Sequence, residues 1–170
     1  MIEFVSDRVV IAGGQKSFKG RIFLGSHWET FVSCVQIFDR LDYKTQWQSA
    51  AARCIERHLV SCLIADIELL SEGKASIHCY PMYPVSYNEN KNVDVIITER
   101  FLEWNTGINI LGEIDTALSD QSVRKSVSKK IFGHLDRLYD LMIADISQTS
   151  KFDVPKRYVS ALASGRGTEV

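Results

Sequence analysis

Hydrophobic and polar positions alternate along much of the first 38 residues, and this alternation predicts strands. We expect a short strand at residues 8–12, which ends at Gly13 and Gly14, and a second strand at residues 20–25. Residues 30–38 are rich in β-branched and aromatic side chains, with apolar residues on both faces. This pattern is typical of a strand that is covered on both sides.

The clearest helical pattern follows directly after these strands. Apolar residues recur from Tyr43 and Trp47 to Ile55 at a spacing close to that of the α-helix, which places them on one face. Asp42 is a suitable N-cap because its carboxylate accepts hydrogen bonds from the free amides of the first turn. We therefore expect a helix from about residue 42 to His58.

Further strand patterns follow the helix in close succession. We expect strands at residues 60–69, 75–83 and 93–102, and a fourth short strand at residues 108–111. A parallel crossover between neighbouring strands needs about a dozen residues or more, and the links here are shorter. The segment is therefore predicted to form an antiparallel meander.

A second long helix is predicted at residues 120–146, where apolar residues again recur at helical spacing. Gly133 weakens its middle, so a bend there is one expectation. Residues 147–170 contain Pro155 and end in small polar residues, and we expect a poorly ordered tail. Residues 1–146 are thus predicted to form one α+β domain, in which an antiparallel β-sheet of about five to seven strands packs against two main helices.

Composition and charge limit the classes of protein to which this chain can belong. Of the 170 residues, 45% are hydrophobic and 24% are charged, which is ordinary for a domain with a core. The net charge of -1 gives no attraction toward nucleic acid or an anionic membrane. No apolar run is long enough to span a bilayer, and the first residues lack a signal-peptide pattern. We therefore expect a cytoplasmic protein with no membrane partner and no direct nucleic-acid partner.

Cysteine spacing and glycine spacing argue against a bound metal or cofactor. The glycines at Gly13 and Gly14 do not have the spacing of a phosphate-binding loop. No two cysteines form a C-x-x-C pair, so free buried thiols are expected and a zinc site is not. The cysteines are Cys34, Cys54, Cys62 and Cys79.

No catalytic motif stands out in the chain. A serine-nucleophile elbow is absent, and no two carboxylates have the spacing of a catalytic dyad. His27 and His78 would form an acid–base pair of the ribonuclease kind if the fold brought them together. A binding protein without catalysis is the main interpretation, and a small histidine-dependent nuclease is an alternative.

Acidic side chains gather near the turns at two places in the predicted sheet. One interpretation is a solvated sheet edge, and the other is an acidic surface that faces a basic partner. Trp104 follows a predicted strand, where it either packs in the core or is exposed to that partner. The candidate partner-binding residues are therefore Asp66, Glu68, Glu72, Glu99, Glu103, Trp104, Glu113 and Asp115.

Several segments share an order and a spacing with a known family of proteins. The run from Asp42 to Trp47, followed by Ala51 and Arg53, fits a D-Y-x-x-Q-W helix. Residues 61–65 and 80–83 fit an S-A-L-I-T strand and a W-P-L-Y element, and residues 93–97 with Leu102 fit a V-x-I-Q-N-x-x-L strand loosely. A G-S-x-x-E-x-F pattern is matched by Gly25, Ser26, Glu29 and Phe31. Over about residues 20–102 the chain thus resembles immunity proteins of bacterial contact-dependent growth inhibition systems, although the Ser-Glu-Trp element of that family is missing.

The resemblance implies a non-catalytic role. Proteins of that family bind the C-terminal toxin domain of a cognate secreted effector, in many cases a nuclease with a basic surface, and block it in the cytosol. The matching residues are of the core type, so the resemblance identifies no toxin contact. We expect a monomer or a weak dimer in the free state. A generic protein-interaction or dimerisation domain is the second alternative.

Overall fold

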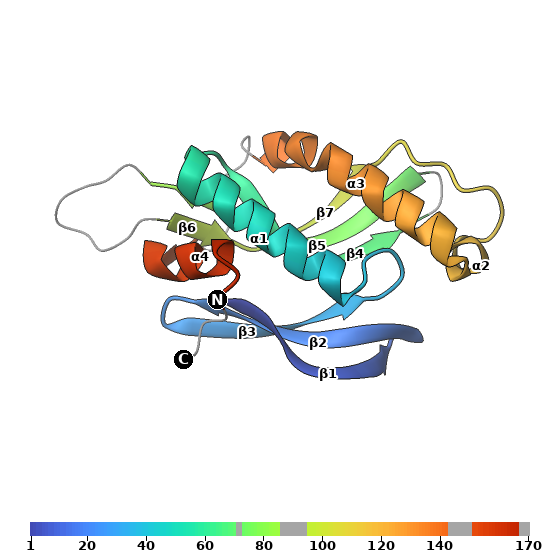
Figure 1. Ribbon diagram of the computed structural model, residues 1–170, viewed down its shortest axis with the longest axis horizontal. Coiled ribbons are helices and arrows are strands. Elements are labelled where there is room, and N and C mark those ends of the chain that lie inside the picture. Colours follow the sequence, from blue (N-terminus) through green and yellow to red (C-terminus); the bar gives the residue numbers. More distant parts are fainter. Residues whose placement is uncertain (71–72, 86–94, 143–150, 167–170) are drawn as a thin grey trace.

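The computed structural model describes residues 1–70, 73–85, 95–142 and 151–166. Within these residues, two antiparallel sheets and four helices confirm the predicted α+β class, although the strands divide between two sheets instead of one. The two long helices, α1 (Arg40–Arg57) and α3 (Gln121–Met142), lie side by side over one face of the larger sheet (Figure 1). The smaller sheet lies next to α1, on the side away from α3. No described helix is long and apolar enough to cross a membrane.

The smaller sheet consists of three consecutive antiparallel strands in the order β1-β2-β3. Both β1 and β2 begin earlier than the hydrophobic pattern predicts. In β1 an irregularity between Phe4 and Val9 interrupts the alternation. β3 ends before residue 38, where the chain turns toward the first helix. The strands are β1 (Ile2–Ala12), β2 (Gln15–Leu24) and β3 (His27–Cys34).

The larger sheet contains the predicted antiparallel meander. Its strands are β4 (Ser61–Leu69), β5 (Lys74–Pro84), β6 (Val95–Thr98), β7 (Arg100–Asn105) and β8 (Lys151–Val154). Both β6 and β7 pair with β5, with Met82 opposite Ile97 and Cys79 opposite Arg100. The strand predicted at residues 93–102 is therefore present in two pieces that meet at Glu99, and residues 93 and 94 lie outside the described residues.

The short strand predicted at residues 108–111 is wrong. The amide and the hydroxyl of Thr106 both donate to the Gly73 carbonyl, at 2.9 and 2.6 Å. The positive φ of Gly107, 66°, then turns the chain away from the sheet. Residues 106–110 are irregular, so their apolar side chains do not extend the meander.

The predicted first helix is confirmed as α1 (Arg40–Arg57), but its N-cap is Asp39 and not Asp42. The Asp39 carboxylate accepts hydrogen bonds from the amides of Leu41 and Asp42, at 2.8 and 2.9 Å. The Asp42 carboxylate accepts one in return from the Asp39 amide at 3.1 Å. The two aspartates form a capping box, in which Asp42 is the third helical residue instead of the cap.

The predicted second helix is present as α3 (Gln121–Met142), preceded by the short helix α2 (Ile114–Ser119). Gly133 lies inside α3 and does not end it. Residues 143–146 lie outside the described residues. The Asp120 carboxylate accepts hydrogen bonds from the amide and the hydroxyl of Ser122, at 2.8 and 2.7 Å, at the junction of the two helices.

The expectation of a poorly ordered tail from residue 147 does not hold for residues 151–163. They form β8, which pairs with β6, and α4 (Lys156–Ala163), which packs against α1. Val154 and Val159 are fully buried, and burial of such side chains holds the segment against the core. Residues 147–150 and 167–170 lie outside the described residues.

The core lies between the two sheets and beneath α1 and α3. All four cysteines are buried and free, as the sequence predicts. Trp104 lies in β7 with 5% of its surface exposed, so it packs in the core and is not presented to a partner.

Candidate functional site

Three side chains of the family-like helix pattern bind the backbone of β4. The Gln46 amide group donates to the Cys62 carbonyl at 2.6 Å and accepts from the Ile64 amide at 2.9 Å. The Trp47 indole donates to the Ile64 carbonyl at 2.7 Å, and the Tyr43 hydroxyl accepts from the Ile67 amide at 3.3 Å. All three are buried, so their role is to fix α1 on the edge of the larger sheet.

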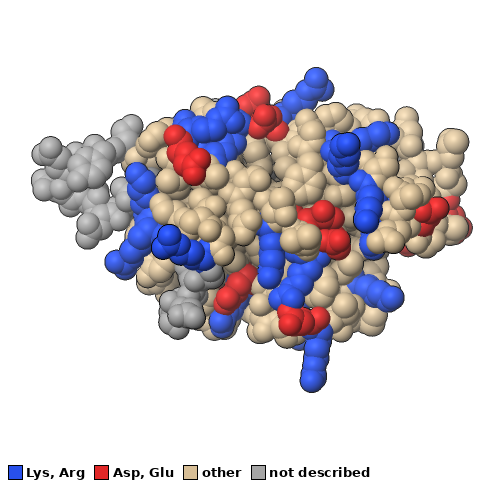
Figure 2. Space-filling view, viewed as in Figure 1, with Lys and Arg blue, Asp and Glu red and all other residues tan. Residues whose placement is uncertain are grey.

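Three of the predicted acidic residues come together around one hollow of about 720 Å³. Glu68 reaches it from β4, and Glu113 and Asp115 reach it from the start of α2. We call it the acidic hollow, and its walls also include Gln15, Gln36, Ile110 and Leu111. It lies at the α2 end of the molecule, where Figure 2 also shows acidic side chains.

Two glutamines hold carboxylates of the acidic hollow in place. Gln15 donates to the Glu68 carboxylate at 2.7 Å, and Gln36 donates to the Asp115 carboxylate at 3.0 Å. The Gln36 side chain also accepts from the Leu69 amide at 2.8 Å. The glutamine side chains carry no charge, so they position these two carboxylates without forming ion pairs with them.

Asp66, two residues before Glu68 on β4, forms its hydrogen bonds with residues of the interior and not with the acidic hollow. Its carboxylate accepts hydrogen bonds from the Cys34 amide at 2.6 Å and from the Tyr43 hydroxyl at 3.4 Å. Burial raises the pKa of Asp66, and the charge of Glu68 adds to that rise. Burial also raises the pKa of the Cys34 thiol to about 11, with further increases from Asp66, Glu68 and Asp115. The carboxylates of this region therefore raise the pKa of neighbouring acidic groups.

The remaining predicted residues do not join this group. Glu99 lies in a separate network with His78, and Glu103 is exposed on β7. Trp104 is buried, and Glu72 lies outside the described residues. The candidate residues taken from the sequence therefore do not form one surface: Glu68, Glu113 and Asp115 line the acidic hollow, whereas Glu99 and Glu103 lie elsewhere.

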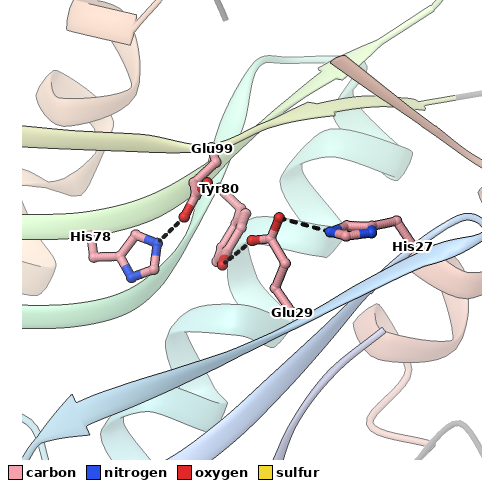
Figure 3. A network of polar contacts seen from close by, with 5 residues as sticks. All are labelled: His27, Glu29, His78, Tyr80 and Glu99. Atoms are coloured by element: carbon pink, nitrogen blue, oxygen red, sulfur yellow. Dashed lines mark hydrogen bonds and ion pairs between the residues drawn. The ribbon is translucent and has the colours of Figure 1, made fainter. Parts of the chain in front are cut away.

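His27 and His78 lie on opposite sides of a group of polar side chains formed by Glu29, Tyr80 and Glu99 (Figure 3). His27 contacts one oxygen of Glu29 at 3.1 Å, and Tyr80 donates to its other oxygen at 3.1 Å. His78 contacts Glu99 at 2.8 Å. Since Glu29 belongs to β3 and Tyr80 to β5, the network joins the two sheets.

Both imidazoles are also stacked on aromatic rings. His78 lies parallel to Phe101, with ring centroids 4.1 Å apart, and His27 lies parallel to Phe152, with centroids 5.5 Å apart. The two histidines contact different carboxylates, with Glu29 and Tyr80 between them (Figure 3). The arrangement therefore differs from two imidazoles that face one reacting group.

Sequence reasoning missed several residues of these two regions. Gln15, Gln36 and Leu111 were not singled out, because glutamine and leucine have no distinctive spacing at a binding surface. In the sequence, Glu29 belongs to the family-like pattern and to a set of scattered carboxylates, and neither gives it a role in a site. Side chains alternate between the two faces of a strand, so Glu29 lies on the same face as the buried Phe31 two residues later. This spacing could have predicted that Glu29 is half-buried.

Comparison with known proteins connects the fold to a toxin and immunity pair. No known family model matches the chain, and no curated protein matches it. Among solved structures, a chain of the CdiA-CT/CdiI toxin and immunity complex from Enterobacter cloacae matches with a TM-score of 0.60, over 98% of this chain and 97% of that chain. The two chains have a similar fold. Their sequences are 11% identical, so the likeness concerns the fold and not individual residues.

Proposed function

We propose that this protein is the immunity protein of a contact-dependent growth inhibition system. In this role it binds the C-terminal toxin domain of a cognate effector in the cytoplasm and neutralises it without catalysis. The observation that carries the proposal is the match in fold to a chain of a toxin and immunity complex over nearly the whole length of both chains.

The sequence supplies independent support for the same role. The family-like pattern of Tyr43, Gln46 and Trp47 coincides with the side chains that fix α1 on β4. A fold can be shared by proteins with different functions, so the pattern adds what the fold alone does not. The order of β3, α1, β4 and β5 also agrees with the order of the family-like segments.

The decisive experiment is protection of a living cell. The toxin is the variable C-terminal domain of the large secreted protein that we expect to be encoded beside this gene. Expression of that domain in a host bacterium should stop growth, and co-expression of this protein should restore it. The two proteins should also copurify. Growth arrest that persists despite soluble expression of this protein would overturn the proposal.

The nuclease alternative has its own measurement. The purified protein is incubated with RNA and with DNA, in parallel with a His27→Gln/His78→Gln variant. We expect no turnover from either protein. Turnover by the wild type that is lost in the variant would favour a histidine-dependent nuclease.

A further inference from the structure

The acidic hollow has the shape of a docking surface at one end of the molecule. Three chain segments meet there: the start of β2, the end of β4 and the irregular chain that leads into α2. Its volume of about 720 Å³ is large enough to admit side chains of another protein. A neighbouring hollow of about 250 Å³ shares Gln15, Gln36 and Asp115 with it, so the depression continues toward the β1–β2 turn.

The charge of the acidic hollow is of one sign. Glu68, Glu113 and Asp115 line it, and the described residues of its walls include no lysine or arginine. Within the described part of the chain, none of these three carboxylates takes part in an ion pair. The neighbouring hollow contributes one cation, Lys16. A positively charged group that entered the acidic hollow would therefore meet three carboxylates without an ion-pair partner among the described residues, and glutamines hold two of the three in place.

Apolar side chains stand beside these carboxylates. Leu111 is 95% exposed, and Ile110 is partly exposed. Both belong to the irregular segment that forms one wall of the acidic hollow. Charged and apolar groups in such proximity match the anatomy of a protein interface, where an apolar centre adjoins polar contacts.

We propose that the acidic hollow is the surface that receives the toxin domain, through a lysine or arginine side chain flanked by apolar residues. This inference rests on the proposed function, which supplies the partner, whereas the charge and the exposed leucine supply its chemistry. The cation meets Glu68, Glu113 and Asp115, and the neighbouring apolar residues cover Leu111. The complex displaces water from the carboxylates and from Leu111, and a charge interaction is stronger where the dielectric constant is lower.

The test compares two variants with the same change in net charge. Glu113→Gln/Asp115→Asn removes two charges from the acidic hollow and keeps the side-chain shapes. Glu56→Gln/Asp140→Asn removes two charges from exposed positions of α1 and α3 that do not line it. A third variant, Leu111→Ser, removes the exposed apolar side chain. Affinity for the purified toxin domain is measured by calorimetry at low and high salt, and circular dichroism verifies the fold of each variant.

The outcomes separate the two proposals. We expect the hollow variant to bind about tenfold more weakly or worse, with a smaller dependence on salt, and the control variant to stay within about twofold of the wild type. Leu111→Ser should weaken binding without changing the salt dependence. If the wild type does not bind the toxin domain, the proposed function fails. If the wild type and the hollow variant bind equally well, the function stands and the docking surface is wrong. A wild-type dimer that Glu113→Gln/Asp115→Asn converts to a monomer would also overturn the inference, in favour of a second copy.

Discussion

The hydroxyl of Tyr80 on β5 donates a hydrogen bond to the carboxylate of Glu29 on β3 at 3.1 Å, and so connects the two sheets. Tyr80 is fully buried. Burial raises the pKa of its hydroxyl well above the ordinary value of 10, and the charge of Glu29 adds to that rise. Near neutral pH the hydroxyl therefore keeps its proton and acts as the donor.

Replacement of Tyr80 by phenylalanine should destabilise the protein. The change leaves the half-buried Glu29 carboxylate with one donor fewer, and we expect a loss of about 1–2 kcal/mol in the free energy of unfolding. Urea unfolding measures it. Tyr158→Phe is the control, because the Tyr158 hydroxyl contacts only the neighbouring Arg157 at the surface among the described residues, at 3.5 Å. Equal stability of the two variants would show that the contact between the sheets contributes nothing.

Gln46→Ala should be more damaging, because Gln46 is fully buried and replaces a missing strand partner for β4. The variant leaves the Cys62 carbonyl and the Ile64 amide without that partner and takes a donor from Tyr139. Each unsatisfied buried group costs about 1–3 kcal/mol, so we expect a loss of about 3 kcal/mol or more. Chemical unfolding checks this value, with the exposed Gln48→Ala on the same helix as control. A loss below about 1 kcal/mol would contradict the role given to Gln46.

The sequence predicted an element most accurately where its hydrophobic pattern and its tertiary contacts favoured the same structure. The apolar stripe of α1 predicted that helix nearly to its ends, because tertiary contacts reinforce the same face. The predicted N-cap, Asp42, was wrong because Asp39 and Asp42 are both suitable capping residues. The backbone conformation before the helix makes Asp39 the cap, and the sequence does not show that conformation. The pattern at residues 108–111 failed, since alternation cannot show that Thr106 and Gly107 redirect the chain.

Site prediction from the sequence was limited in a similar way. Acidic residues near turns are easy to see, but their division into an acidic hollow and a histidine network depends on long-range contacts. Gln36 reaches Asp115, and Tyr80 reaches Glu29, across large distances in the sequence. No periodic pattern carries such information, because each of these contacts joins elements that only tertiary packing brings together.

Two glycine substitutions should change stability in opposite directions. Gly133 lies in α3 with open space around it, so Gly133→Ala should stabilise the protein by about 0.5–1 kcal/mol through helix propensity. A Cβ on Gly20 would lie 2.2 Å from the Phe31 ring, and overpacking of this kind costs about 1–3 kcal/mol. In thermal and urea unfolding, Gly133→Ala should therefore be more stable than the wild type and Gly20→Ala less stable. A stabilising Gly20→Ala would contradict the close contact between β2 and β3.

The four buried cysteines should stay unreactive in the folded protein. A thiol whose pKa is raised to about 11, as for Cys34 and Cys54, carries almost no thiolate near neutral pH. We therefore expect no labelling by Ellman's reagent without denaturant, and labelling of all four thiols in urea. Rapid labelling of one thiol in the native protein would show that its surroundings open to solvent.

Asp66 should make stability depend on pH in a direction opposite to that of an ion-paired carboxylate. Burial raises its pKa in the folded protein above the ordinary value of 3.8, so the folded state holds the proton more tightly than the unfolded chain does. Its contribution to stability is complete below pH 3.8 and is lost as the pH rises through the higher, folded-state pKa. The difference in unfolding free energy, wild type minus Asp66→Asn, should therefore fall over that window and then level off. The paired measurement largely cancels the other carboxyl groups, and a difference that rises with pH would show that the hydrogen bonds from Cys34 and Tyr43 outweigh the cost of burial.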